Sequence, residues 1–491
     1  MRVLNTTTFE LEEIPTAPTK AERLQALQAK AEPGKAPEYA ILSHRWITSK
    51  PKSDSDLDSG AKEEAATGTK QQAKSESESE VTFDVLSKWL ESAHLRRSIR
   101  KIKKACHITG VKNINDPFAG HVHDKRFGRS IEKIKTACRI ARTANIKWLW
   151  IDTCCIDKSS DAEMAESLRS MYRWYRNAKI CYAYLYDVDS TGTVGVFDLF
   201  QASKTLRNGE DQQSRSSNSV WFERGWTLQE LLAPKEVCFY DFKWRVIGTK
   251  TELAKDIAAV TGIDAKYLGH DRAFRKACIA TKMSWLANRT TTRSEDIAYS
   301  TLGIFSISDF TPLYGEGMSA FLRLQKALVP RQDESLYAWE MPDSKNRLCS
   351  GWATHEWGLP APWPACFRGS AHINVDGEKS ERYLGGFNIL GPGVNVHVGR
   401  SELGGELINR KTARTLTLNC WTSDKKAVRI PIKRASKNSQ LWRRQECHKL
   451  DTSGSSDVPK TDLNSIATGT MTVPVLVVQP SVADDSDDDR C

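Results

Sequence analysis

Short apolar runs alternate with amphipathic segments along the first half of the chain. In four of these runs the apolar residues follow one another without polar alternation, which is typical of strands buried on both faces. Between them, apolar residues recur three and four positions apart, which predicts helices with one buried face. The expected strands are residues 39–42, 147–152, 179–186 and 236–241, and the expected helices are residues 129–143, 161–177, 219–233 and 250–261.

This order of elements predicts an α/β fold built on a parallel sheet with helices on both faces. Ligands of such sheets bind beyond the carboxyl ends of the strands. Polar side chains stand at three of those ends: Ser43, His44 and Arg45 follow the first strand, Asp152 follows the second and Asp187 follows the third. We therefore expect a ligand site at this edge. For His44, a proton-transfer role and a structural hydrogen-bonding role are both open.

The pattern changes in the rest of the chain. Residues 272–330 have helical spacing, and residues 335–480 contain strand-like runs separated by Gly and Pro. Residues 49–80 carry almost no large apolar side chain, so burial cannot offset the entropy lost on ordering them. We expect this stretch to be a disordered insert.

A duplicated stretch interrupts the first half. RSIRKIKKAC at 97–106 recurs as RSIEKIKTAC at 129–138. The second copy leads directly into a strand, so we assign it to the core and expect the first copy to lie outside it. The predicted organisation is an N-terminal segment (1–38), an α/β domain (39–262) with a disordered insert (49–80) and the duplicated segment (97–128), a helical extension (263–334), a β-rich C-terminal domain (335–450) and a mostly disordered tail (451–491).

Composition and charge narrow the classes of partner. The net charge of +10 is spread over 491 residues without basic blocks or a nucleic-acid-binding signature, so we expect no nucleic-acid partner. No apolar run reaches the length of about 18 residues that a membrane span needs. The early acidic stretch ELEE, with no apolar signal core before it, predicts a cytoplasmic protein. The twelve cysteines include no CxxC pair and no zinc spacing with His, so we expect no metal site.

Two nucleotide-binding motifs are absent from the sequence. No GxxxxGK[ST] phosphate loop occurs, and no GxGxxG motif follows an expected strand. These absences argue against a nucleotide-driven switch and against hydride transfer with a bound dinucleotide. We expect no resident cofactor.

The stretch RGWTLQELL, residues 224–232, carries a candidate catalytic carboxylate. Trp226 and Glu230 are four residues apart, so they share one face of the expected helix. An indole beside a carboxylate excludes water, which raises the pKa of the carboxylate and strengthens its attraction to positive charge. Such a group suits cleavage of a glycosidic bond. An ordinary amphipathic helix with a core Trp226 and a solvated Glu230 has the same spacing, and the pattern leaves both interpretations open.

Three stretches, YAILSHRW at 39–46, LWIDTCCID at 149–157 and RGWTLQE at 224–230, together resemble the signature blocks of the fungal heterokaryon-incompatibility (HET) domain. Their order and spacing also fit once the insert and the duplication are discounted, and the resemblance covers about residues 39–233. HET domains are distantly similar to Toll/interleukin-receptor (TIR) domains, so the resemblance implies a TIR- or flavodoxin-like α/β fold. It also implies a role in self/non-self recognition and programmed cell death.

The resemblance further implies a reaction. Some TIR domains cleave the nicotinamide–ribose bond of NAD through a glutamate in a W-x-x-x-E setting, which Trp226 and Glu230 match. Glu230 is then the catalytic residue, and Ser43, Arg45, Asp152 and Trp226 contact the substrate NAD. The alternative is a non-enzymatic TIR-like signalling module that acts through homotypic assembly, for which a homo-oligomer is the expected form.

Overall fold

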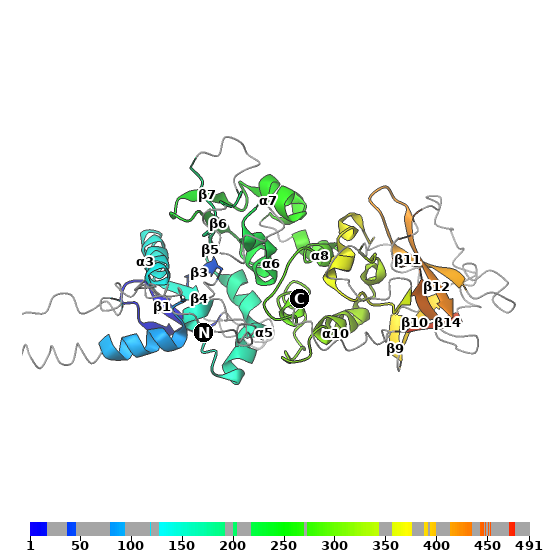
Figure 1. Ribbon diagram of the computed structural model, residues 1–491, viewed down its shortest axis with the longest axis horizontal. Helices are drawn as coiled ribbons and strands as arrows, with labels where there is room; N and C mark the ends of the chain where they lie inside the picture. Colours follow the sequence, from blue (N-terminus) through cyan, green and yellow to red (C-terminus); the bar gives the residue numbers. More distant parts are fainter. Residues whose placement is uncertain are drawn as a thin grey trace, which may run out of the picture. The chain divides into compact units, whose positions relative to one another are not determined.

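The computed structural model of the chain consists of two compact units. Unit 1 comprises Met1–Ser167, Trp174–Tyr186 and Pro234–Ile247, and unit 2 comprises Leu168–Arg173, Asp187–Ala233 and Gly248–Cys491. Figure 1 labels the helices and strands. The residues that the structure describes are 1–16, 37–45, 79–93, 118, 127–191, 200–203, 218–269, 273–342, 356–375, 387–390, 393–398, 413–434, 442–445, 447, 450, 452 and 471–476.

A seven-stranded sheet with the order β2-β1-β4-β3-β5-β6-β7 forms the centre of unit 1 (Figure 1). Its four middle strands pair in parallel. They correspond to the four strands that the apolar runs predicted. The bounds are Tyr39–His44 for β3, Trp148–Ile151 for β4, Ile180–Tyr184 for β5 and Val237–Tyr240 for β6.

The sheet is mixed, which corrects the expectation of a purely parallel one. β1 (Arg2–Asn5) pairs antiparallel with β4 and with β2 (Leu11–Glu13), and β7 (Val246–Thr249) lies next to β6 at the other edge. The hairpin of β1 and β2 escaped prediction because its strands are short and contain no long apolar run. Since β1 pairs with β4, the hairpin covers a strand edge that would otherwise offer open hydrogen-bonding groups.

Helices α3 (Gly128–Thr143) and α5 (Asp161–Asn177) match two of the predicted helices. The Oγ of Ser160 accepts a hydrogen bond from the backbone N–H of Glu163 at 3.3 Å and caps α5. The side chain of Glu163 does not return the bond as in a full capping box. It accepts a hydrogen bond from Arg2 Nη1 at 2.7 Å instead. The predicted apolar face of α3 is buried, with Ile131, Ile134, Cys138 and Ala141.

A buried carboxylate anchors the chain to α3 directly after the predicted insert. Glu80 accepts hydrogen bonds from Ser130 Oγ at 2.7 Å and from the ammonium group of Lys133. Ser130 Oγ in turn accepts the backbone N–H of Val81 at 2.9 Å. Burial raises the pKa of Glu80, but the charges of Lys133 and His44 outweigh it and hold the pKa at about 2. The carboxylate is therefore ionised throughout the physiological pH range.

Two segments expected to lie outside the core contribute residues to it. Glu80 ends the predicted insert, whose residues 49–78 lie outside the described residues. Phe118 belongs to the duplicated segment 97–128 and is fully buried. Its ring packs edge-on against that of Trp89, with the centroids 6.0 Å apart. Low sequence complexity and duplication therefore do not exclude single residues of these segments from the core.

The helices of unit 2 are short. α7 ends at Gly262, directly after the predicted helix 250–261, and the φ of 71° at this residue is in the left-handed region that favours glycine. None of the described helices combines the length and the apolar character needed to cross a bilayer. The helical spacing of residues 272–330 agrees with the burial of six apolar side chains there: Trp285, Ile297, Leu302, Phe321, Leu324 and Leu328. The bounds are Val220–Glu223 (η4), Gly225–Leu232 (α6), Ala254–Thr261 (α7), Ala265–Tyr267 (η5), Ala273–Lys276 (η6), Ile279–Ser284 (α8), Asp296–Tyr299 (α9), Ser319–Leu328 (α10), Val329–Arg331 (η7), Glu334–Tyr337 (η8), Pro364–Phe367 (η10) and Ser370–His372 (η11).

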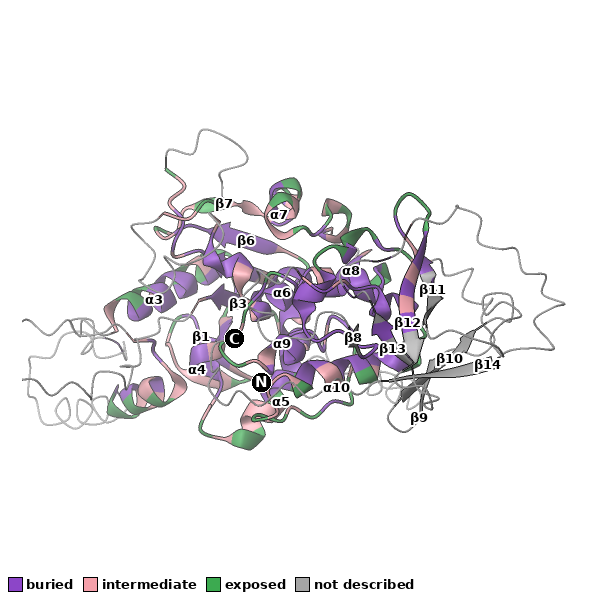
Figure 2. Ribbon diagram, turned by 45° about the vertical axis from the view of Figure 1, so that its right-hand side comes forward, coloured by how far each residue is buried: buried purple, intermediate pink, exposed green. Residues whose placement is uncertain are grey.

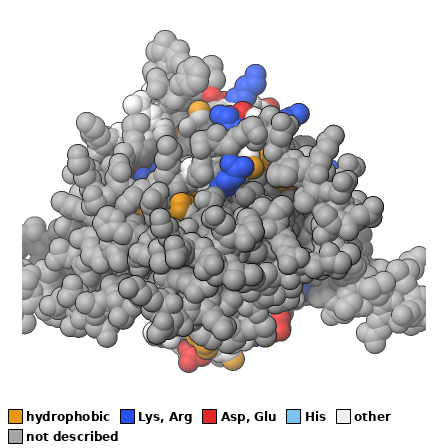
Figure 3. Space-filling model, turned by 90° about the vertical axis from the view of Figure 1, so that its right-hand side faces the viewer, with side chains coloured by type: hydrophobic (Ala, Val, Ile, Leu, Met, Phe, Trp, Pro, Cys, Tyr) orange, Lys and Arg blue, Asp and Glu red, His pale blue; other side chains and the backbone are white. Residues whose placement is uncertain are grey.

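Unit 2 also contains a second sheet of seven strands, with the order β11-β12-β13-β14-β10-β9 and with β8 paired to β13. β14 comes from the tail that was expected to be mostly disordered. Figure 3 shows a few described Lys and Arg side chains (blue) near acidic ones (red) on one face. The strands are Glu356–Trp357 (β8), Phe387–Leu390 (β9), Gly393–Val398 (β10), Ala413–Trp421 (β11), Ala427–Arg434 (β12), Trp442–Gln445 (β13) and Met471–Leu476 (β14).

A buried arginine links this sheet to the helical part of unit 2. Arg444 on β13 is 0% exposed, and its guanidinium lies 3.9 Å from the centroid of the Trp339 ring. It donates to the backbone oxygen of Tyr337 at 3.2 Å and to that of Trp339. These contacts satisfy Nη1 and Nη2 and so reduce the cost of burying the charged group.

We expect Gly303→Ala to destabilise unit 2. A Cβ at position 303 would lie 2.0 Å from Cγ of Tyr172, so the Tyr172 ring or the backbone has to move. Overpacking of this kind costs about 1–3 kcal/mol in the free energy of unfolding. Urea unfolding followed by circular dichroism measures the change. Gly128→Ala is the matched control, because nothing lies within 4 Å of its added Cβ. Equal urea midpoints for the two variants would contradict the packing.

We expect Glu80→Gln to destabilise unit 1 by about 3–5 kcal/mol at neutral pH, because Lys133 loses its buried counter-charge. The pKa of Glu80 is lowered from 4.5 to about 2 on folding. Its stabilisation is therefore present above about pH 4.5 and is lost as the pH falls towards about 2. Urea unfolding between these pH values should show the wild-type advantage shrinking as the pH falls. A constant difference between the two proteins across that window would refute the assignment.

Candidate functional site

The carboxyl end of β3 places polar residues in the middle of the sheet of unit 1. Ser43 lies opposite Ala183 and His44 lies opposite Tyr184 of β5. Ser43 and His44 are 1% and 5% exposed, whereas Arg45, directly after the strand, is half-buried. Across the sheet the parallel strands follow one another as β4, β3, β5 and β6. β3 comes first in the sequence but stands second in the sheet, so the direction of the strand order reverses at β3. Open α/β sheets bind ligands beside such a reversal.

His44 lies between two carboxylates. Its Nε2 is 3.8 Å from Oε1 of Glu80, and its Nδ1 is 4.0 Å from Oδ1 of Asp152. Asp152 is the first residue of the short helix α4 (Asp152–Cys155), which follows β4 directly. The side chain of Asp152 is 21% exposed, whereas that of His44 is 0% exposed. His44 therefore lies between the partly exposed carboxylate of Asp152 and the buried ion pair of Glu80 and Lys133.

The adjacent cysteines after Asp152 are unsuited to nucleophilic catalysis. Burial raises the pKa of Cys155 to about 12, and it also raises the pKa of Cys154. Cys154 Sγ donates a hydrogen bond to the backbone oxygen of Val81 at 3.1 Å. Both thiols stay protonated at neutral pH, whereas a nucleophilic cysteine reacts as the thiolate. Both are core residues.

Asp187, the polar residue expected at the third strand end, has a structural role. Its Oδ1 accepts a hydrogen bond from Ser219 Oγ at 2.5 Å, and its Oδ2 accepts the backbone N–H of Val220 at 2.9 Å. The residue is 0% exposed. These bonds satisfy the amino end of the 3-10 helix that precedes α6.

Helix α6 in unit 2 carries Trp226 and Glu230, and Figure 2 shows it largely buried. It begins at Gly225, where an added Cβ would lie 2.5 Å from Cγ2 of Thr291. Glu230 is 8% exposed, whereas Trp226 is half-buried. The interpretation as an ordinary amphipathic helix expected the reverse, with a solvated glutamate and a core tryptophan. The carboxylate of Glu230 is therefore held inside unit 2.

A buried cation lies beside Glu230. Arg289 is 5% exposed, and burial lowers the pKa of its guanidinium to about 9 while attraction to Glu230 opposes the shift. Its Nη1 donates to the backbone oxygen of Arg224 at 2.8 Å and to Thr227 Oγ1 at 2.9 Å, and its Nε donates to the backbone oxygen of Trp285 at 3.1 Å. The guanidinium thus keeps its charge at neutral pH. A cation in this position favours the ionised form of the neighbouring carboxylate.

The indole of Trp226 is held by a different carboxylate. Its N–H donates a hydrogen bond to Asp296, which also accepts one from the Tyr314 hydroxyl at 2.9 Å. The sequence predicted an indole that shields Glu230. The structure gives the indole a hydrogen-bond acceptor, Asp296, that lies 70 positions further along the chain and that no local pattern indicates.

The predicted site residues therefore fall into two groups. Ser43, Arg45 and Asp152 belong to unit 1, and Trp226 and Glu230 belong to unit 2. Within the described part of the chain, His, Cys, Asp and Glu side chains form no group of three or more that suits a metal ion. The sequence did not reveal the charged partners in either group, because they are distant in the chain: Glu80, Lys133, Arg289 and Asp296.

Comparison with known proteins gives one family match. Residues 122–230 match the family described as Heterokaryon incompatibility protein (HET). The blocks at 149–157 and 224–230 lie inside this range, and the block at 39–46 precedes it. The vegetative incompatibility protein HET-E-1 of Podospora anserina is 37% identical over 205 residues, which are 41% of this chain and 14% of that protein. The chain therefore spans a small part of its relative's length.

No solved structure matches the chain significantly. The family match and the relative confirm the resemblance that the three sequence blocks carry. On this basis residues 122–230 are similar to the heterokaryon-incompatibility (HET) family, and the chain shares sequence with a fungal incompatibility protein.

Proposed function

We propose that the chain is a heterokaryon incompatibility protein whose HET domain causes cell death by cleaving the nicotinamide–ribose bond of NAD. The family match and the name of the Podospora anserina relative support the role in incompatibility. The observation that carries the chemical part is the buried carboxylate of Glu230. It lies beside the cationic Arg289 at the last position of the matched range 122–230.

The order of the parallel strands supports a TIR-like fold for unit 1. Strands β4, β3, β5 and β6 stand side by side in that order. Numbered along the chain they read 2-1-3-4, which are the first four positions of the flavodoxin-like order 2-1-3-4-5. The additional antiparallel hairpin of β1 and β2 does not alter this central arrangement.

In the proposed reaction, the bond between C1′ of the ribose and the nicotinamide nitrogen breaks, and nicotinamide leaves with the bonding electron pair. The ribose becomes an oxocarbenium-like cation, which the ionised Glu230 stabilises by its charge. Water then adds to C1′ and releases a proton. NAD and water thus give nicotinamide, ADP-ribose and a proton, with no resident cofactor.

The remaining predicted residues have supporting roles in this proposal. Trp226 provides an aromatic surface one helical turn from Glu230. Ser43, Arg45 and Asp152 are proposed substrate contacts, since they stand at or directly after the carboxyl ends of parallel strands. Substitution of each contact should raise KM more than it lowers kcat, because binding rather than charge stabilisation is lost.

We expect Glu230→Gln to reduce NAD cleavage by the purified full-length chain by about 100-fold or more, because the amide cannot stabilise the developing cation. Chromatography of NAD, nicotinamide and ADP-ribose over time measures the rate. Glu166→Gln is the matched control, since Glu166 is exposed on α5 within the matched range. The control should cleave NAD at the wild-type rate.

A double variant separates a catalytic Glu230 from a structural one. Glu230→Gln alone leaves Arg289 buried without its counter-charge, and loss of such a partner is destabilising. Glu230→Gln combined with Arg289→Gln removes both charges and should recover much of the thermal stability without recovering cleavage. Recovery of cleavage in the double variant would show that Glu230 acts through folding alone.

Induced expression in a fungal host distinguishes the proposal from the assembly alternative. Wild-type protein should lower cellular NAD before viability falls, and Glu230→Gln should prevent both effects. Cell death at constant NAD would instead favour a non-enzymatic module that acts through homotypic assembly.

A further inference from the structure

The segment that holds α6 lies outside the matched domain. Gly225 donates its backbone N–H to Thr290 O at 2.8 Å, and Thr290 donates its own to Glu223 O at 2.7 Å. This parallel bridge fixes the start of α6 against residues that follow the matched range 122–230 by about sixty positions. The same downstream stretch supplies Arg289, whose guanidinium is attracted electrostatically to Glu230.

Asp296, the first residue of α9, belongs to this downstream segment and holds Trp226. Burial raises the pKa of Asp296, and the hydrogen bonds from Trp226 and Tyr314 oppose that shift by favouring the charged acceptor. Tyr314 contributes its hydroxyl at 2.9 Å from Oδ1. One carboxylate thus binds an indole N–H and a phenol O–H, and it fixes both aromatic side chains relative to α6.

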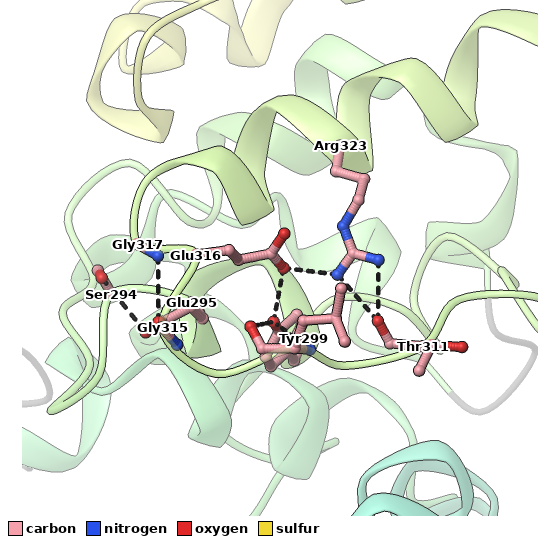
Figure 4. Close-up of polar contacts among 9 residues, drawn as sticks. Ser294, Glu295, Tyr299, Thr311, Gly315, Glu316, Gly317 and Arg323 are labelled. Carbon is pink, nitrogen blue, oxygen red and sulfur yellow. Dashed lines mark hydrogen bonds and ion pairs between the residues drawn. The ribbon is translucent and has the colours of Figure 1, made fainter.

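The loop that follows Tyr314 is held by hydrogen bonds at Gly315, Glu316 and Gly317 (Figure 4). Glu295 Oε1 accepts the backbone N–H groups of Gly315 at 2.7 Å and Gly317 at 3.1 Å. Both glycines have positive φ, 96° and 54°, in the region that side chains with a Cβ rarely adopt. The loop conformation therefore depends on these glycines and on the Glu295 carboxylate.

A second carboxylate secures the other side of the loop (Figure 4). Glu316 Oε1 accepts hydrogen bonds from the Tyr299 hydroxyl at 2.7 Å and from Arg323 Nη2 at 2.5 Å. The same arginine donates to the backbone oxygen of Thr311 at 2.9 Å. Tyr314 nevertheless remains 38% exposed. The contacts of Glu295 and Glu316 therefore fix the position of Tyr314 and do not bury its ring.

We propose that Asp296 and Tyr314 are positioning residues that fix the indole ring of Trp226, so that the site on α6 is complete only with the segment downstream of the matched domain. The catalytic part of this inference rests on the proposed cleavage of NAD. The structural part does not, because it concerns the hydrogen bond of the Trp226 indole itself.

Nuclear magnetic resonance of the full-length chain labelled with 15N in its tryptophan indoles tests the structural part. Trp226→Phe identifies the Trp226 cross-peak by its loss. Asp296→Ala should move that cross-peak, because the acceptor is removed, whereas Asp296→Asn keeps an acceptor oxygen and should leave the cross-peak near its wild-type position. Asp309→Ala, at an exposed aspartate in the same unit, is the control and should change nothing.

The kinetic part uses the same variants together with Tyr314→Phe, which removes one hydroxyl from a partly exposed residue and leaves the rest of the side chain in place. We expect Asp296→Ala to lower kcat for NAD cleavage by up to about 100-fold, the loss that a small misplacement causes, and Asp296→Asn to recover most of it. Tyr314→Phe should give an intermediate loss and move the Trp226 cross-peak. The circular dichroism spectra of these variants should equal that of the wild-type protein.

The possible failures are distinct. An unmoved Trp226 cross-peak in both Asp296→Ala and Tyr314→Phe overturns the positioning inference, whatever the activity. A moved cross-peak in a protein that never cleaves NAD upholds the positioning of Trp226 and refutes the proposed reaction. If Asp296→Ala does not fold, Tyr314→Phe decides the matter alone.

Discussion

A charge that is removed from water needs a partner, and this constraint organises both units. In unit 1 the ammonium of Lys133 is neutralised by Glu80, 53 positions earlier in the chain. In unit 2 the guanidinium of Arg289 is attracted electrostatically to Glu230 and donates a hydrogen bond to Thr227, 62 positions earlier. Breaking either pair leaves a buried ion without compensation, which costs far more than losing an exposed pair. The polar groups of functional interest therefore also hold together distant parts of the sequence.

At Glu230 the same constraint bears on the proposed reaction. Its helix is short and mostly buried, so its carboxylate cannot turn freely towards solvent. The proposed reaction needs a negative charge beside a developing positive charge, and the buried cation Arg289 interacts electrostatically with this carboxylate. Both the stability of unit 2 and the proposed reaction therefore require the positive charge of Arg289.

The elements with strong local patterns were predictable from the sequence. The four parallel strands are uninterrupted apolar runs, α3 has its apolar residues at helical spacing, and Gly262 ends α7 as a left-handed cap. The hairpin of β1 and β2 was not predictable, because strands this short carry no clear period. The spacing of Trp226 and Glu230 correctly placed both on one helix. Their partners Asp296 and Arg289 were not predictable, because a contact between distant residues leaves no trace in local periodicity.

The place of β3 in the sheet has a consequence for how the family domain is delimited. The matched range begins at residue 122, whereas β3 consists of residues 39–44 and stands between β4 and β5. A fragment cut to the matched range would therefore lose β3, and the edges of β4 and β5 that pair with β3 would both be left without a partner strand. Unpaired strand edges form hydrogen bonds with strands of other chains, so such a fragment should self-associate by strand pairing rather than fold as a monomer.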